Sequence, residues 1–372
     1  MKIVFIGCRG IHILGGIESY MYNLTQELNK LGHECIVWCE SDHHDVEVIN
    51  GVKVIYQPGP KSAFLCKPWC GLKATLKTLF KEKNVSFIHY NAWGPSLLAC
   101  WIPRLFGVQS LMEGHGLEWQ RSKYSSKKQK IMRLMEKITA KMNQNLIMCS
   151  EAQVRYFKKE YGLDSTCMPC AVTLPKEDYN NPSNVLERFG LEEGKYFLFL
   201  ARLVQDKNPD FLIKAFKEAK RDGYKLVIAG SNDAMPDYVD KLHELGADCE
   251  DVVFTGAMYA DDKDMLLRKA FCYCIPSTIE GLAIGLLEAM SYKLPVIASD
   301  IEANQEALDE DEAVWCKAED VDSLKSAIEK CVENPNLLEA FKERTFEKIK
   351  QKYTWDKVAM KYVDYLHSLG IN

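Results

Sequence analysis

Short apolar segments alternate with amphipathic segments along most of the chain, and this alternation limits the possible folds most strongly. The run "KIVFIG" (2–7) is continuously apolar and ends in glycine, and segment 18–33 then carries apolar residues at helical spacing. Strands without polar alternation suit a parallel sheet that is covered by helices on both faces. The pattern predicts a doubly wound α/β fold. The predicted strands of this first series are 2–7, 34–40, 52–58, 85–91, 108–115 and 144–150.

The alternation is interrupted once and then resumes. Segment 167–194 is rich in Pro, Asn and acidic residues and has no strand at its centre, which is typical of a connection between domains. We therefore expect two Rossmann-like domains that face each other across a cleft, with ligands at the carboxyl ends of the strands. The second strand series is 195–203, 224–231, 251–256, 271–277, 295–300 and 312–317. The predicted parts are an N-terminal domain (1–172), a connection (173–194), a C-terminal domain (195–353) and a final helix (354–372) that can pack back on the first domain.

Composition excludes several classes of function. The chain has 372 residues and a formal net charge of -5, which does not favour binding to nucleic acid. It has no apolar run of about 18 residues, so we expect no transmembrane helix. The apolar start is too short for a signal peptide and is interrupted by Arg9, so we expect a cytoplasmic protein.

Two carboxylates flank an apolar and glycine-rich stretch in "IPSTIEGLAIGLLEAM" (275–290). Glu280 lies in the loop after a predicted strand, and Glu288 lies about one turn into the next helix. Between them, the N–H groups of Ile284, Gly285 and Leu286 point out of a helix N-terminus, which attracts phosphate. This arrangement suits a sugar, a diphosphate and a ribose in that order. Two solvated surface carboxylates would produce the same spacing, so the pattern alone does not distinguish a binding site from an ordinary helix start.

The same region, "STIEGLAIGLLEAMSYKLPVIASD" (277–300), resembles the E-x7-E segment of retaining glycosyltransferases of the GT-B fold, the group 1 or family 4 set. The resemblance implies that Glu280 contacts the donor sugar and Glu288 the ribose. The family's usual Phe-Gly-x-Pro core is replaced here by residues 282–285, which leaves the donor open. The resemblance extends over nearly the whole chain.

Two cations fit the family's R-x4-K signature in "ARLVQDKN" (201–208). Arg202 is predicted at a strand end and Lys207 in the following loop. The resemblance implies that both neutralise the donor diphosphate, and arginine can bind two of its oxygens at once. The family often has Gly after this Lys, whereas the present chain has Asn208.

A histidine with a glycine on each side lies in "EGHGLEWQRSKY" (113–124). His115 matches the family histidine that faces the donor sugar. The extended segment resembles a subset that includes bacterial polysaccharide rhamnosyltransferases. In that subset Glu118, Arg121 and Lys123 would line the acceptor side.

Glycines at loop starts complete the expected donor site. Gly16 matches the family loop that lets the backbone approach the donor phosphates. Gly230, Ser231 and Gly256 end strands where the family wraps the nucleotide. The segment Asp262–Asp264 looks like a metal-binding D-x-D motif, but it opens a predicted helix, where Asp is a common cap. We expect no metal and no cofactor besides the sugar nucleotide.

A basic amphipathic segment spans residues 121–141. It contains eight Lys or Arg residues and one acidic residue, Glu136, and its apolar residues Ile131, Leu134 and Ile138 share one helical face with Met135. Such a helix can lie on an anionic membrane. Its apolar face can equally pack into the first domain, and both possibilities stay open.

Together with these features, the resemblance implies a retaining hexosyltransferase that moves a sugar from a nucleoside-diphosphate sugar to a saccharide acceptor. The resemblance favours L-rhamnose from dTDP-L-rhamnose, with UDP-hexoses (glucose, galactose or N-acetylglucosamine) and GDP-mannose as alternative donors. It also suggests a lipid-linked acceptor in cell-surface polysaccharide synthesis, met at the inner face of the plasma membrane. Three alternatives are an NAD-dependent oxidoreductase, a sugar-nucleotide epimerase and an inactive nucleotide-sugar binder. The first lacks the G-x-G-x-x-G fingerprint.

Overall fold

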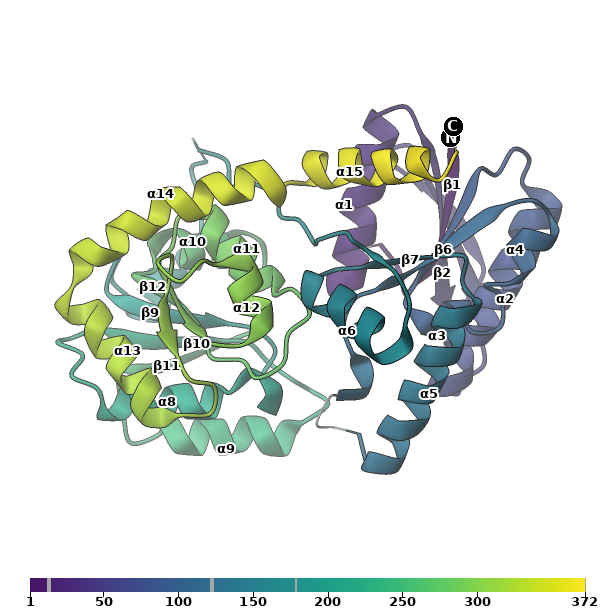
Figure 1. The fold of residues 1–372 in the computed structure, drawn as a ribbon. Coiled ribbons are helices and arrows are strands. Elements are labelled where there is room, and N and C mark those ends of the chain that lie inside the picture. The colour runs from purple at the N-terminus through teal and green to yellow at the C-terminus, as the bar shows by residue number, and fades with distance from the viewer. Residues whose placement is uncertain (12–14, 121–123, 178, 372) are drawn as a thin grey trace. The chain divides into compact units, whose positions relative to one another are not determined.

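The computed structural model describes residues 1–11, 15–120, 124–177 and 179–371 of the chain (Figure 1). The chain divides into two compact units. Unit 1 comprises residues 1–171 together with 355–372, and unit 2 comprises residues 172–354. In the described residues, no helix is both long enough and apolar enough to cross a membrane.

Unit 1 is built on an eight-stranded sheet with the order β3-β4-β2-β1-β5-β6-β7-β8. Every neighbouring pair is parallel except β3 and β4, which are antiparallel. The strands are β1 (Lys2–Cys8), β2 (Glu34–Ser41), β3 (Asp45–Ile49), β4 (Val52–Pro58), β5 (Phe87–Asn91), β6 (Gln109–Gly114), β7 (Asn145–Met148) and β8 (Thr166–Cys167). The helices are α1 (Gly16–Lys30), α2 (Ala63–Lys81), α3 (Trp93–Ser96), α4 (Ile102–Leu105), α5 (Ser126–Met142), α6 (Glu151–Tyr161) and α15 (Trp355–Ser368), with a 3₁₀ turn at Glu118–Gln120.

Helices cover both faces of this sheet, as the uninterrupted apolar strands predict. Successive residues of a strand point to opposite faces. In β1, Val4 and Ile6 belong to the core cluster that includes Ala74 of α2. Phe5 points the other way, and its ring lies 6.1 Å from that of Tyr362 in α15. The last helix therefore belongs to the core of unit 1.

Unit 2 contains a six-stranded parallel sheet with the order β11-β10-β9-β12-β13-β14. Its strands are β9 (Tyr196–Leu200), β10 (Lys225–Ala229), β11 (Val252–Gly256), β12 (Cys272–Ile275), β13 (Val296–Ser299) and β14 (Val314–Cys316). Its helices are α7 (Val185–Arg188), α8 (Pro209–Glu218), α9 (Pro236–Gly246), α10 (Ala260–Lys269), α11 (Ile284–Ser291), α12 (Glu302–Ala307), α13 (Val321–Glu333) and α14 (Pro335–Lys352), with a 3₁₀ turn at Gln205–Lys207. The predicted α/β fold with two parallel-sheet units is confirmed.

The order of strands in unit 2 fixes the place of its loops. The chain passes from β9 outward to β10 and β11, and then returns to β12 on the other side of β9. The carboxyl ends of β9 and β12 therefore lie side by side at the point where the strand order reverses, which is where open α/β sheets bind ligands. The loops that follow these two strands carry residues 201–208 and 276–283.

Candidate active site

An ion pair joins the two loops at the switch point of unit 2. The ammonium group of Lys207, in the 3₁₀ turn after β9, donates a hydrogen bond to the Glu280 carboxylate. The Glu280 side chain is only 7% exposed, and such burial makes an ion pair sensitive to loss of either partner. The two residues that the sequence assigned to separate motifs thus meet at one place.

Backbone contacts hold these loops together. Asn208 has a left-handed backbone (φ 51°), a conformation that favours Gly and is tolerated by Asn. Its side-chain amide donates to the Pro276 carbonyl at 2.9 Å, and the Thr278 N–H donates to the Asp206 carbonyl at 2.9 Å. Asn208, where the family often has Gly, therefore keeps the turn and adds a tether between the loops.

Helix α11 begins directly after the second loop. Gly285 lies in its first turn, where a Cβ atom would come within 2.5 Å of the Tyr273 hydroxyl. That hydroxyl donates to the Leu200 carbonyl at 3.1 Å, so the helix approaches β9 and β12 closely. The N–H groups of Ile284 and Gly285 precede the first intrahelical hydrogen bond. The Leu286 N–H, which was expected to be free, donates to the Ala283 carbonyl at 3.0 Å because the helix opens with a tight turn.

Glu288 has a cationic partner that the sequence analysis missed. The Lys263 ammonium of α10 lies 2.5 Å from the Glu288 carboxylate. Lys263 occupies the middle of the D-x-D sequence, and the two flanking carboxylates are engaged elsewhere. Asp262 pairs with Arg188 at 2.6 Å, and Asp264 with Arg268 at 2.8 Å. Within the described ranges, no group of three or more side chains is arranged to hold a metal ion.

The remaining predicted donor residues of unit 2 lie at neighbouring strand ends. Gly230 follows β10, and its N–H donates to the carbonyl of Gly256 at 2.9 Å. A Cβ atom on Gly230 would lie 1.9 Å from the Ala201 carbonyl oxygen, so only glycine fits there. Gly256 has φ +71°, and Ser231 follows Gly230 in the same loop. Arg202 is exposed two residues after the end of β9.

In unit 1, His115 follows β6 and lies at the carboxyl edge of the sheet. Its Nε2 atom is 3.2 Å from the Asn91 side-chain oxygen at the end of β5, and its ring meets the Tyr20 ring edge-on at 5.2 Å. These contacts fix the orientation of the imidazole without burying it completely. His115 is therefore well placed to meet a ligand at this edge.

A buried carboxylate lies directly behind His115. Oε2 of Glu113 is 3.7 Å from Nε2 of His115 and 2.9 Å from Nε2 of His89, whose other ring nitrogen is 2.9 Å from the Tyr362 hydroxyl. Glu113 and His89 are both fully buried. Burial raises the pKa of Glu113 to about 7, although the neighbouring His115 opposes the shift, and burial lowers the pKa of His89. The sequence gives no signal for this cluster because "FIHYN" and "SLMEGH" look like ordinary core strands.

We expect Glu113→Gln to flatten the pH dependence of the predicted glycosyl transfer. As the pH rises from about 6 to 8, Glu113 loses its proton, and its carboxylate then attracts the imidazole of His115. The kcat/KM of the wild type should rise over this interval, and that of the variant should stay about tenfold lower at pH 8. Glu34→Gln, at an exposed position, serves as the control. An equal loss at every pH would show that Glu113 is only structural.

The glycine loop of unit 1 has a charge pair that was not predicted. Gly16 is the first residue of α1 and is exposed. Arg9, after β1, donates to the buried Glu18 carboxylate at 2.8 Å. Burial raises the pKa of Glu18, but the Arg9 guanidinium and backbone N–H groups more than offset this, and the pKa lies below its ordinary value. Glu118 begins the 3₁₀ turn after β6. The other two predicted acceptor-side residues, Arg121 and Lys123, lie outside the described residues.

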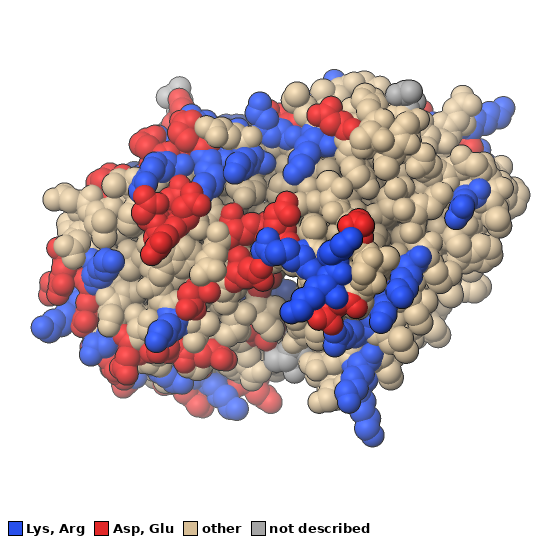
Figure 2. Space-filling view, viewed as in Figure 1, with Lys and Arg blue, Asp and Glu red and all other residues tan. Residues whose placement is uncertain are grey.

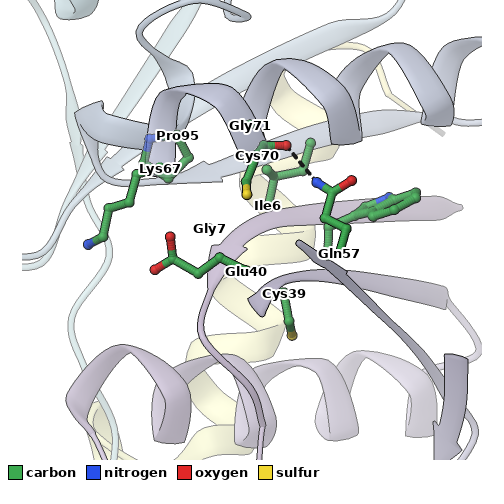
Figure 3. A pocket seen from close by; sticks show the side chains of 10 residues that line it. Ile6, Gly7, Cys39, Glu40, Gln57, Lys67, Cys70, Gly71 and Pro95 are labelled. Carbon is green, nitrogen blue, oxygen red and sulfur yellow. Dashed lines mark hydrogen bonds between the residues drawn. The ribbon is translucent and has the colours of Figure 1, made fainter. Parts of the chain in front are cut away.

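A small pocket lies at the carboxyl ends of β1, β2 and β4, under α2 (Figure 3). Glu40 from β2 and Lys67 from α2 line it, and the Gln57 amide donates to the Cys70 carbonyl at 2.7 Å across one wall. Burial raises the pKa of Glu40, and the positive charge of Lys67 partly offsets the shift. The space between them is about the size of one water molecule, which is too small for a sugar ring.

Comparison with known families places both units in one class of enzyme. Residues 14–174 match the family model described as Glycosyltransferase Family 4, and residues 186–348 match the model described as Glycosyl transferases group 1. Together with the two Rossmann-like sheets, these matches define a glycosyltransferase of the GT-B fold. The first unit is thus similar to glycosyltransferase family 4 and the second to the group 1 glycosyltransferases.

Individual relatives agree with this assignment over almost the full length. An uncharacterized glycosyltransferase of Methanocaldococcus jannaschii is 26% identical, covering 95% of this chain and 94% of its own. A GDP-mannose-dependent monoacylated α-(1-6)-phosphatidylinositol monomannoside mannosyltransferase of Corynebacterium glutamicum is 22% identical, covering 95% of each chain. The crystal structure of Anabaena HepE in complex with UDP and glucose has a TM-score of 0.79 at 15% identity, covering 99% of this chain and 100% of that one.

Proposed function

We propose that this glycosyltransferase retains the anomeric configuration and uses a nucleoside-diphosphate sugar as donor. The observation that carries the proposal is the Lys207–Glu280 pair beside the N-terminus of α11. Lys207, Arg202 and the N–H groups of Ile284 and Gly285 would stabilise the charge that grows on the leaving diphosphate. Glu280, held by Lys207, would accept hydrogen bonds from the donor sugar.

The proposed transfer needs no metal and no separate base. The bond between the anomeric carbon and the phosphate oxygen breaks while the acceptor oxygen forms a bond on the same face. The acceptor proton passes to an oxygen of the departing diphosphate. His115 would orient the donor sugar, and Glu288 would accept hydrogen bonds from the ribose. A carboxylate has acceptor sites for several donors, so Glu288 can hold both Lys263 and a ribose hydroxyl.

Three donors are each supported by a specific observation. The resemblance of segment 113–124 to rhamnosyltransferases supports dTDP-L-rhamnose. The similarity to a GDP-mannose-dependent mannosyltransferase supports GDP-mannose as the second candidate. UDP-hexoses are the third, because HepE was crystallised with UDP and glucose. We propose L-rhamnose as the transferred sugar.

A thermal-shift panel of dTDP, UDP and GDP tests the donor base. A nucleotide at about 100 times its Kd stabilises the folded protein by about 2.7 kcal/mol, which raises the Tm by several degrees. We expect dTDP to give the largest shift at equal concentration. A larger shift with GDP would favour mannose. Equal, negligible shifts with all three would contradict a nucleotide-binding function.

The acceptor is proposed to be a saccharide linked to a lipid, which brings the enzyme to the inner surface of the membrane. In α5, the apolar residues Ile131, Leu134 and Ile138 are exposed, whereas Met132 and Thr139 face the core. The apolar face that the sequence left open is thus outside the core of unit 1. With its flanking lysines, this face supports peripheral contact with an anionic membrane through residues 121–141.

A further inference from the structure

The basic segment 121–141 contains a single carboxylate, and the fold buries it. Glu136 lies on the inner side of α5, between Met132 and Ala140, and only 2% of it is exposed. Figure 2 shows Lys and Arg side chains gathered over the part of unit 1 where Figure 1 draws α5 and α6. At the surface a carboxylate would offset these cations at little cost, whereas a buried one requires hydrogen-bond donors around it. The position of Glu136 therefore indicates a specific set of donors inside unit 1.

Two donors from other parts of unit 1 meet the same oxygen of Glu136. The Tyr161 hydroxyl of α6 donates to Oε1 at 2.8 Å, and the indole N–H of Trp119 donates to it at 3.3 Å. The Tyr156 hydroxyl lies 3.1 Å from the hydroxyl of Tyr161 and extends the cluster along α6. A carboxylate is a stronger acceptor than a neutral group. Glu136 therefore ties the 3₁₀ turn at Glu118–Gln120 to both α5 and α6.

The Trp119 ring has two further contacts that fix its orientation. The Arg133 guanidinium lies 5.2 Å from the ring centre, within the range of a cation–π contact, and the Tyr156 ring lies 6.1 Å away at an angle of 38°. Arg133 is itself paired with Glu160 at 2.6 Å. The indole is nevertheless partly exposed. A large ring that is already held in one orientation can bind a ligand at a small cost in side-chain entropy.

The turn that carries Trp119 follows shortly after His115. Gly116 has φ +148°, a backbone conformation that favours glycine, and no atom lies within 4 Å of an added Cβ. Packing at Gly116 therefore does not fix the direction of the chain, and contacts of the following residues must do so. Leu117 packs against the buried cluster that contains Met148, and Trp119 adds the hydrogen bond to the buried carboxylate.

We propose that the exposed part of the Trp119 indole binds a sugar ring of the acceptor, and that Glu136 is the positioning residue that holds the indole in place. This inference rests on the proposed transfer to a saccharide. Sugar rings carry hydroxyl groups around their rim and C–H groups on their faces, and such a face packs well on the apolar surface of an indole. The same loop carries His115, which the resemblance places beside the donor sugar. An acceptor ring on Trp119 can therefore meet the donor sugar at this edge of the sheet.

Steady-state kinetics of the full-length protein tests the proposal. The acceptors are methyl glycosides of glucose, galactose, mannose, N-acetylglucosamine and rhamnose, and the one that the wild type uses fastest is kept for the variants. Trp119→Ala should raise the KM for this acceptor about tenfold or more, because it removes a large apolar contact with the sugar. Its Kd for the nucleoside diphosphate should equal that of the wild type. Trp101→Ala removes another exposed tryptophan of unit 1 and should be normal in both measurements.

The positioning role of Glu136 has its own pair of variants. Glu136→Gln keeps an oxygen that accepts from the indole N–H, so its KM for the acceptor should stay near the wild-type value. Glu136→Leu removes the acceptor oxygen and should raise this KM. Thr139→Val removes another buried polar group from α5, one that donates to the Met135 carbonyl at 2.7 Å, and should lower only the Tm. A purely structural Glu136 would likewise change only the Tm in Glu136→Leu.

Three results would overturn the inference. One is an active wild type whose acceptor KM does not change in Trp119→Ala, which would leave Trp119 as a part of the fold only. Another is an equal rise of the KM in Trp101→Ala, because the effect would then not depend on the position of the ring. The third is a wild type that binds a nucleoside diphosphate and transfers sugar to none of the glycosides. Only this third result also contradicts the proposed transfer reaction, so the two failures are recognised separately.

Discussion

Replacing Lys207 by alanine should lower kcat by about a hundredfold or more. Lys207 pairs with Glu280 in the loop that leads into α11, and the proposed transition state places its growing negative charge at the N-terminus of this helix. Loss of one preorganised donor of this kind costs about a hundredfold to a thousandfold in turnover. Arg202→Ala should have an effect of similar size for the same reason. Steady-state kinetics with the donor identified by thermal shift measures both effects.

The variant also leaves a buried carboxylate without its partner, so stability must be separated from catalysis. Lys207→Ala removes the ion pair of Glu280, and an unpaired buried charge destabilises a protein by several kcal/mol. The double variant Lys207→Met/Glu280→Gln removes both charges and should recover most of the Tm. It should not recover kcat. Lys214→Ala, on an exposed side of α8, is the matched control and should be normal in both. Near-normal turnover in Lys207→Ala and Arg202→Ala would contradict the proposed diphosphate site.

The sequence predicts the sheets well because their strands are continuous in hydrophobicity. All strands with uninterrupted apolar runs, from β1 to β14, lie within a few residues of their predicted ranges. The two missed strands lack that signal. Strand β3 is an edge strand in which Val46 and Val48 are exposed between acidic residues, and β8 has only two residues. Edge strands need apolar residues on one side at most, so periodicity does not separate them from loops.

The residues of the candidate site were also predicted only where the sequence pattern marks them. Residues in loops after strands are visible in a sequence because a charge or glycine there interrupts an apolar pattern, as with Lys207 and Glu280. Partners that come from elsewhere in the chain are not visible. Lys263 pairs with Glu288 from a different helix. Glu113, which lies beside His115, has the sequence surroundings of an ordinary core strand. Their roles depend on distances that only the folded chain defines.

The same limit explains why the exposed apolar side of α2, with Leu65, Trp69, Leu76 and Phe80, was not predicted. Its apolar stripe has helical periodicity, and an amphipathic helix is expected to turn that stripe toward the core. In α2 the inner side instead carries small residues, among them Gly71, where a Cβ atom would lie 1.9 Å from the carbonyl oxygen of Pro95 in α3. The close approach of α3 leaves room only for small residues on the inner side. The larger side chains therefore point outward.

Replacing Gly230 by alanine should damage both stability and donor binding. The added methyl group would overlap the carbonyl oxygen of Ala201, which is backbone and cannot rotate away. Relief requires the ends of β9 and β10 to separate, and overpacking of this kind costs about 3 kcal/mol. For a unit of this size, the Tm should fall by roughly 6–12 °C. Because Ala201 precedes Arg202, the shift also displaces the guanidinium from the proposed diphosphate site.

Gly223→Ala provides the matched control for this prediction. Gly223 has φ +80° and no atom within 4 Å of an added Cβ, so alanine there is strained by its backbone but meets no obstacle. We expect it to lose about 1 kcal/mol and to keep normal kinetics. Gly230→Ala should instead raise the Kd for the nucleoside diphosphate, measured by calorimetry below the lowered Tm, by about tenfold or more. Tight binding in Gly230→Ala would mean that the strand ends near Arg202 do not hold the diphosphate, because a displaced guanidinium cannot bind it at full strength.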